Sequence, residues 1–227
     1  MIVKIKGKEL VPGKDFSIDP SSRGGKQTLI PKEISGDQTL DLNYLRKSIR
    51  EVISERNGAI AFNYKDAPKD SIQKIQSIIR EVATILPVIE VMTTKFTWSV
   101  GRSQVNYPYI QIQDSVYISG AAIEYDIEAR VIKDYQSQNV IGYLPAKKKC
   151  AKTVMFTAHY DHLGRMGADT YFPGANDNAS GSAMLLTMAK YFKENPSDYN
   201  VMFVAFAGEE AGLVGSKHFV ENSLFKL

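Results

Sequence analysis

The segment NVMFVAFAG, residues 200–208, contains seven consecutive apolar side chains and no charge. A strand of this composition is buried on both faces, which is typical of a parallel strand covered by helices. TVMFTAH at 153–159 predicts a second strand, and helices are predicted over 180–194 and 210–222. Because strand, loop, helix, strand and helix follow in that order, we expect a right-handed α/β crossover in a mostly parallel sheet with flanking helices.

Three polar segments follow or precede these elements. AHYDHLG comes at the end of one strand, GANDNASG at 174–181 precedes a helix, and the two glutamates of AGEEAG follow the other strand. In open α/β sheets, ligands bind beyond the carboxyl ends of the strands. We therefore expect residues 159–162, 174–181 and 208–210 to meet at one edge of the sheet.

Upstream, residues 1–122 predict a compact α/β or α+β unit. The first 35 or so residues are rich in Gly, Pro, Ser and Lys and indicate short strands joined by turns. An apolar stripe from 42 to 53 predicts a helix capped by Asp41, and a second helix is predicted from a cap at Asp70 or Ser71. Further strands are predicted at AIAFNY (59–64), VIEVMTT (88–94), KFTWSV (95–100) and YPYIQIQ (107–113). Residues 127–144 predict a hairpin that turns near SQN.

The composition excludes several classes of function. The net charge is +3, from 28 basic and 25 acidic side chains among 227 residues, too balanced to indicate binding to nucleic acid or to an anionic membrane. The lone Cys150 excludes an intramolecular disulfide and a thiolate metal cluster. No apolar run approaches the ~18 residues of a membrane span, and MIVKIKGKEL does not resemble an export signal.

The predicted edge collects two histidines and four carboxylates: His159, His162, Asp161, Asp177, Glu209 and Glu210. Imidazole and carboxylate are the ligands that zinc and similar ions take when cysteine is absent. An aspartate two residues after a histidine can accept the imidazole N–H and so fix the ring. Adjacent glutamates point different ways, so one can ligate a metal while the other faces a water. A single aspartate in a glycine-flanked loop can bridge two cations ~3.5–4 Å apart.

Each of these features also has an ordinary structural interpretation. A histidine can be a hydrogen-bonded core residue, Asp177 can form an Asx turn or a helix cap, and two glutamates can begin a helix. On this interpretation three unrelated elements would meet at one sheet edge by chance. A shared metal site explains their meeting more economically. His218 lies in a predicted helix beside Lys217 and is given no role.

The motifs AHYDHLG, PGANDNASG and FAGEEAGLVGS, in this order, resemble the co-catalytic zinc aminopeptidases of metallopeptidase family twenty-eight. The resemblance covers about 150–222. Upstream, NGAIAFNYKD and YPYIQIQDS are similar to the protease-associated type of domain. The resemblance implies a protease-associated-like domain over 1–122 and the N-terminal part of a zinc peptidase catalytic domain, a partial zinc-exopeptidase fold, over 123–227.

The resemblance also implies a role for each residue. His159 would ligate a first zinc and Asp161 would orient it, while Asp177 would bridge two zinc ions through a loop with a cis peptide to Asn178. Glu209 would be the general base and Glu210 a ligand of the second zinc. The implied reaction is hydrolysis of the N-terminal peptide bond of peptide substrates.

In one respect the sequence departs from the family. Family members take a further aspartate and a further histidine ligand from later segments, and this chain holds neither after Glu210. We therefore expect a fragment that is inactive alone. The resemblance implies a parent protein that is exported to the periplasm or beyond. A single-zinc glutaminyl cyclase and a non-catalytic peptide-binding or protein-interaction module stay open as alternatives, and the sequence does not reveal the oligomeric state.

Overall fold

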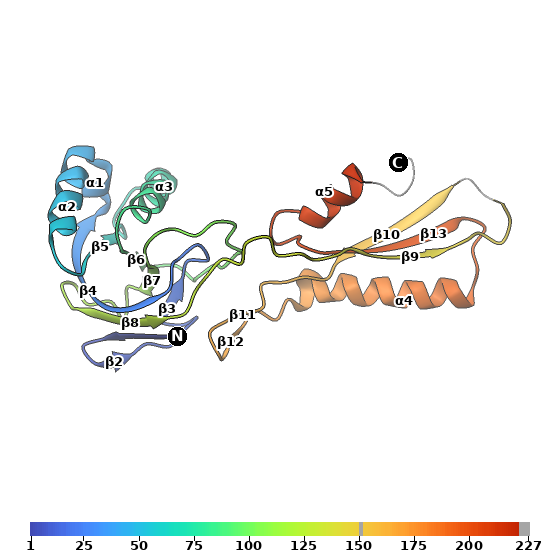
Figure 1. Cartoon of the computed structure of the whole chain (residues 1–227), viewed down its shortest axis with the longest axis horizontal. Coiled ribbons are helices and arrows are strands. Elements are labelled where there is room, and N and C mark those ends of the chain that lie inside the picture. Colours follow the sequence, from blue (N-terminus) through green and yellow to red (C-terminus); the bar gives the residue numbers. More distant parts are fainter. Residues whose placement is uncertain (150–151, 223–227) are drawn as a thin grey trace. The chain divides into compact units, whose positions relative to one another are not determined.

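The computed structural model of the chain describes residues 1–149 and 152–222 (Figure 1). Two compact units are present: Met1–Ile132 with Met166–Thr170 form unit 1, and Lys133–Arg165 with Tyr171–Leu227 form unit 2. Cys150 lies outside the described residues. No helix in the described part of the chain is both long and apolar enough to cross a bilayer.

Unit 1 contains an eight-stranded sheet of order β2-β1-β8-β4-β5-β6-β7-β3. The four strands β4, β5, β6 and β7 run parallel, and the remaining neighbours pair antiparallel. The strands are β1 (Ile2–Ile5), β2 (Lys8–Glu9), β3 (Phe16–Ile18), β4 (Gly25–Ser35), β5 (Gly58–Asn63), β6 (Val88–Met92), β7 (Tyr109–Gln113) and β8 (Ile123–Ile127). This is a mixed α/β unit, as the sequence predicts.

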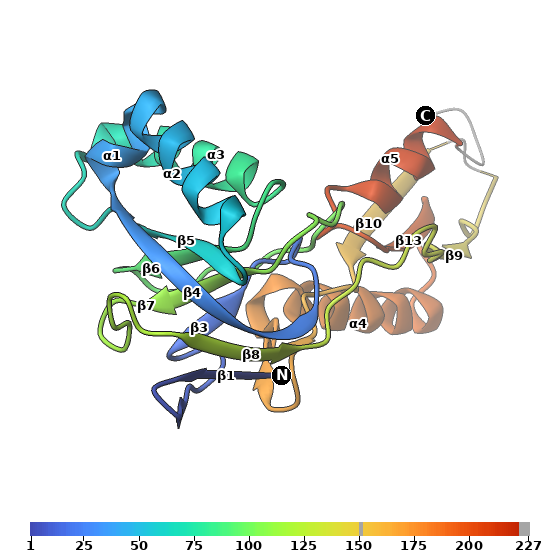
Figure 2. The ribbon, with the colours of Figure 1, turned by 60° about the vertical axis from the view of Figure 1, so that its left-hand side comes forward.

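Three helices cover one face of this sheet (Figure 2). They are α1 (Gly36–Leu40), α2 (Leu42–Ser54) and α3 (Ile72–Val82), with a short 3-10 turn at Lys69–Ser71. The Asp41 side chain accepts the first free amides of α2, which confirms the predicted cap. The core between helices and sheet includes Ile34, Phe62 and Ile79, all fully buried.

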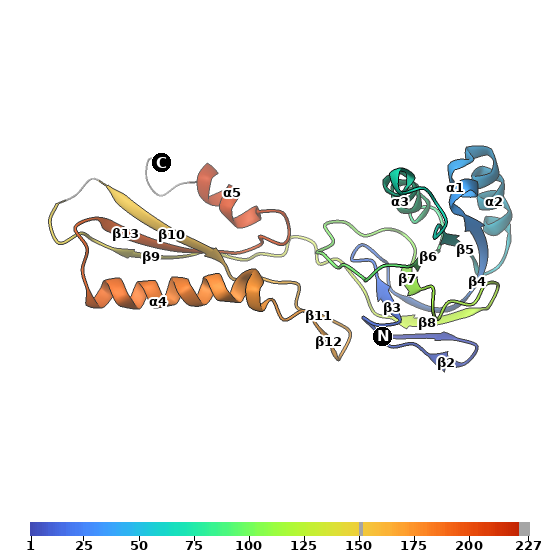
Figure 3. The ribbon, with the colours of Figure 1, turned by 180° about the vertical axis from the view of Figure 1, so that it is seen from behind.

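Unit 2 is built on a three-stranded sheet of order β10-β13-β9. β10 (Thr153–His159) and β13 (Asn200–Phe206) are parallel, and β9 (Val140–Leu144) pairs antiparallel with β13. The helices α4 (Ser180–Glu194) and α5 (Val214–Glu221) lie on opposite faces of the sheet (Figure 3). A separate two-stranded ribbon is formed by β11 (Arg165–Met166) and β12 (Thr170–Tyr171), and its residues Met166–Thr170 belong to unit 1.

The apolar segment of β13 forms the buried central strand of this sheet, as the sequence predicts. Its residues from Val201 to Val204 are buried, and the strand lies between the two others. On one face Phe203 stacks on Phe156 of β10 with ring centroids 5.7 Å apart, and Phe192 of α4 packs on both rings. On the other face Phe206 meets Phe219 of α5 edge-to-face. A strand with helices on both faces must be apolar throughout.

Two predicted elements are wrong. Residues 95–100 form no strand, because both edges of the preceding β6 are taken by β5 and β7, and Trp98 instead donates its indole N–H to the Ile18 carbonyl at 2.7 Å. Residues 127–144 form no hairpin, because β8 pairs with β1 and β4 while β9 pairs with β13. β8 therefore belongs to the first sheet, and the compact units divide after Ile132, whereas the predicted domain boundary falls between 122 and 123.

Candidate metal centre

The parallel pairing of β10 and β13 brings the predicted residues to one edge. His159, the last residue of β10, is in register with Phe206, the last residue of β13, and Tyr160 N–H bonds the Phe206 carbonyl at 3.0 Å. Both strands therefore end together, and the segments that follow them start side by side. The sequence prediction that 159–162 and 208–210 share an edge is confirmed.

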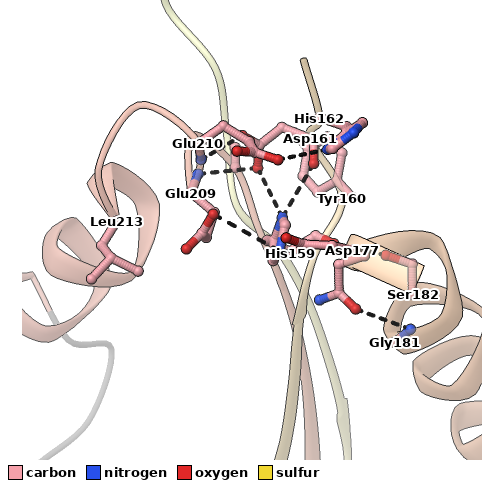
Figure 4. A network of polar contacts seen from close by, with 12 residues as sticks. His159, Tyr160, Asp161, His162, Asp177, Gly181, Ser182, Glu209, Glu210 and Leu213 are labelled. Atoms are coloured by element: carbon pink, nitrogen blue, oxygen red, sulfur yellow. Dashed lines mark hydrogen bonds and ion pairs between the residues drawn. The ribbon is translucent and has the colours of Figure 1, made fainter. Parts of the chain in front are cut away.

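His159 lies at the centre of this group, with 11% of its side chain exposed. Its Nε2 is 3.0 Å from Asp177 Oδ1 and 3.9 Å from Glu209 Oε2, so one ring nitrogen faces two carboxylates (Figure 4). The backbone of the histidine is fixed as well, because the Ser182 hydroxyl at the start of α4 donates to its carbonyl at 2.9 Å. The first turn of α4 thus locates the imidazole against the Asp177 loop.

The Asp161 carboxylate hydrogen-bonds the backbone of the glutamate segment and not the His159 imidazole. Its Oδ1 accepts the backbone N–H of Glu209 at 3.1 Å, and its Oδ2 accepts that of Glu210 at 3.2 Å. The carboxylate is 3.7 Å from His159 Nδ1, beyond hydrogen-bond length, whereas the Asp161 carbonyl lies 3.2 Å from that nitrogen. The same residue therefore faces the ring with its backbone and anchors two amides with its side chain.

The two glutamates occupy a turn rather than the first turn of a helix. Gly212 and Leu213 both donate their amides to the Glu209 carbonyl, and both have positive φ angles. A left-handed backbone at these positions ends the turn, so α5 begins at Val214. The predicted start of this helix at residue 210 is therefore wrong. The turn also separates the side chains: Glu209 faces His159, while Glu210 points at a second histidine.

That second histidine is His162, whose Nδ1 lies 2.6 Å from Glu210 Oε1. Both side chains are largely buried, with 25% and 17% exposed. The sequence predicted that His162 lies at this edge but predicted no role of its own for it. The signal that pointed to it was the clustering of two of the three histidines within one tetrapeptide.

The Asp177 loop is shaped by its glycines and by an amide side chain. Gly174 has φ +58°, and a Cβ there would lie 2.5 Å from the His162 ring; a Cβ at Gly181 would lie 2.2 Å from Asn178 Oδ1. That oxygen accepts the Gly181 amide at 3.1 Å. The Asp177–Asn178 peptide is cis, as the resemblance implies. The glycines therefore admit neighbouring side chains, and the Asp177 carboxylate remains 73% exposed.

The donors fit zinc in type, and one pair fits in distance. Two ligands of a tetrahedral zinc with bonds of ~2.0–2.1 Å are separated by roughly 3.3 Å, and His159 Nε2 and Asp177 Oδ1 are 3.0 Å apart. Glu210 faces His162 instead of this pair. Within 1–149 and 152–222, no three histidine, cysteine or carboxylate side chains converge tightly enough to hold an ion. The described residues thus form a two-donor pair with two further carboxylates close by.

A family of known peptidases shares this part of the chain. Residues 139–226 match Peptidase family M28. The matched segment contains all three motifs on which the resemblance rests, and it contains every residue of the candidate site. The match supports the predicted family resemblance for the peptidase-like segment.

Individual relatives extend the similarity upstream. Aminopeptidase YwaD of Bacillus subtilis is 40% identical over 214 residues, which are 92% of this chain and 37% of that protein. An aminopeptidase of Pseudomonas aeruginosa is 50% identical over 69 residues, 30% of this chain and 12% of that protein. Among solved structures, BSAP, a zinc aminopeptidase from Bacillus subtilis, is similar with a TM-score of 0.62 and 21% identity, over 100% of this chain and 52% of that chain. This last likeness shows the fold. The chain spans well under half the length of the curated relatives named here.

Proposed function

We propose that this chain supplies the catalytic base and part of the zinc site of a metal-dependent aminopeptidase that hydrolyses peptides. The observation that carries the proposal is the meeting of His159, Asp177 and Glu209 where β10 and β13 end. The names of the related aminopeptidases support it. Because the chain matches 37% of YwaD, the activity is proposed for the whole protein.

His159, Asp177 and Glu210 are the residues that would hold zinc. The chemistry supplied by zinc at such a site is polarisation of the scissile carbonyl and activation of a water. Of the two remaining carboxylates at this edge, Asp161 accepts backbone amides, and Glu209 is one-third exposed and 3.9 Å from His159 Nε2. It is close enough to the same centre to take the proton of an attacking water and free to pass it to the leaving amine. Asp161 keeps this base in place, because its carboxylate accepts the backbone N–H of Glu209.

Three finer features belong to the same proposal. The first is the binding of two zinc ions. The Asp177 side chain is 73% exposed and only one of its oxygens faces His159, so its other oxygen would be available to a second ion. The protease-associated-like character of 1–122 and export of the whole protein to the periplasm or beyond are proposed from the resemblance alone.

Replacement of the base tests the proposal. In the whole protein, Glu209→Gln keeps the size of the side chain and removes its capacity to accept a proton. We expect kcat for N-terminal hydrolysis to fall by about 10²–10⁴-fold, with zinc affinity and peptide binding retained. Glu194→Gln, at the exposed end of α4, is the matched control and is expected to keep full activity. Undiminished hydrolysis by Glu209→Gln would exclude Glu209 as the base.

Experiments on the whole protein also distinguish the aminopeptidase from the two alternative functions. A glutaminyl cyclase would cyclise N-terminal glutamine with one zinc per chain, so product analysis and zinc stoichiometry identify it. A binding module would show peptide binding without turnover, and Glu209→Gln would then change nothing.

A further inference from the structure

His162 contacts one carboxylate oxygen of Glu210, and the proposed reaction gives this contact no role. Nδ1 and Oε1 are 2.6 Å apart, within the range of a charge-assisted hydrogen bond. A carboxylate only accepts, so Nδ1 is the donor. Figure 4 shows the two side chains pointing toward one another across the edge of the sheet. Glu210 is thereby held at one oxygen, which leaves the other for a ligand.

The His162 ring is fixed from its other side by the Asp177 loop. A Cβ on Gly174 would lie 2.5 Å from Cδ2 and 2.7 Å from Cγ of this ring, so the glycine lies directly against the imidazole. The Gly174 carbonyl accepts the Ala179 amide at 3.0 Å and closes the turn that carries Asp177. Any shift of this turn therefore presses on the ring that holds Glu210.

The geometry points to His162 as a positioning residue that sets the orientation of Glu210 and couples it to the Asp177 loop. The inference rests on the proposed function only in taking Glu210 and Asp177 as zinc ligands. Ligating carboxylates in proteins are themselves hydrogen-bonded, and the residues that orient them strongly affect metal affinity. In this chain the orienting group is a histidine one residue after Asp161, so the segment 160–162 anchors the glutamate turn at two points: Asp161 at its amides and His162 at a carboxylate.

The first test requires no metal. In the 227-residue chain, the side-chain carboxyl ¹³C signal of Glu210 reports its hydrogen bond by NMR. We expect His162→Phe, which keeps a ring and removes the donor, to shift this signal. His162→Asn, which keeps a donor near the position of Nδ1, should shift it less. His218→Phe is the matched control, because that histidine bonds Asn222 within α5 and should leave Glu210 unchanged.

Coupling to the Asp177 loop is tested by Gly174→Ala. The added methyl would lie 2.5 Å from the His162 ring and 2.9 Å from the Asp177 carbonyl oxygen, so we expect it to displace the ring and to shift the Glu210 signal in the otherwise native chain. The signal is expected to stay unchanged in the His162→Asn background. Gly164→Ala is the control: Gly164 also has a positive φ, +73°, but a Cβ there meets nothing within 4 Å. A Glu210 signal insensitive to Gly174→Ala, or equally sensitive in both backgrounds, would overturn the coupling.

Zinc titration of the whole protein gives the second readout. We expect His162→Phe to weaken zinc binding by about 10–100-fold, as is typical of residues that orient a metal ligand, and His162→Asn to weaken it clearly less. Equal loss in the two variants, with the fold retained, would show that the imidazole itself ligates and would overturn the positioning role. If the whole protein bound no zinc while the Glu210 signal of the 227-residue chain still responded to His162→Phe, the positioning of Glu210 would stand and the proposed function would fail.

Discussion

Asp161 bonds two consecutive backbone amides with the two oxygens of one carboxylate. These amides belong to Glu209 and Glu210, so the residue that follows β10 fixes the segment that follows β13. An ionised carboxylate is well suited to this task, because it offers acceptors on both oxygens and no donor that would oppose an amide.

We predict that Asp161→Asn exposes one of these amides. Asparagine keeps a single carbonyl oxygen and directs an NH₂ group at the other amide, which then lacks a partner. Loss of one such bond corresponds to about 1–3 kcal/mol, so hydrogen exchange at Glu209 or Glu210 should become about 5- to 160-fold faster. Asp198→Asn, at an exposed loop position, is the control. Unchanged exchange at both amides would contradict the anchoring role.

At this scale the sequence predicted which residues meet but not how they contact one another. His159, Asp177 and Glu209 were placed together because strand ends of a parallel sheet share an edge, and the structure brings both carboxylates within 4 Å of His159 Nε2. The contact of His162 with Glu210 spans 48 residues. It depends on the left-handed turn before α5, where Leu213 adopts a positive φ that its residue type does not favour. Local patterns carry no signal for such a contact.

Among the elements, two were predicted to the residue, whereas β13 ends two residues before the end of its predicted segment, 200–208. β10 and α4 have the predicted bounds, 153–159 and 180–194. The failures are segments whose partners lie elsewhere: residues 95–100 had no free strand to pair with, and residues 127–144 divide between two sheets. Strand propensity was present in both, but pairing is decided by the whole sheet.

The caps of two helices give a prediction at the same scale. Asp41 accepts the amides of Asn43 and Tyr44 at the start of α2, whereas Ser71, at the start of α3, makes no capping bond. We expect Asp41→Ala to lower the free energy of unfolding of unit 1 by about 1 kcal/mol and Ser71→Ala to change it by less than about 0.5 kcal/mol. Urea unfolding followed by circular dichroism measures both. Equal losses in the two variants would show that the Asp41 bonds do not stabilise α2.

For the whole molecule, the number of donors limits what the chain can bind. All five residues assigned to catalysis or metal binding lie in unit 2, and within the described residues no three potential donors surround one point. Zinc affinity depends on a complete set of ligands held in place. We therefore predict that the 227-residue chain binds zinc weakly and has no peptidase activity. Robust aminopeptidase activity of this chain, abolished by a chelator, would refute the prediction.

The central claim is that His159 and Asp177 form the start of a cation site at the common end of β10 and β13, with Glu209 beside it. The most direct measurement is an anomalous difference map, recorded at the zinc absorption edge, from crystals of this chain soaked in excess zinc. The account predicts a peak within bonding distance of His159 Nε2 and an Asp177 oxygen. A map with no peak there, and with the Asp177 carboxylate turned to solvent, would contradict it.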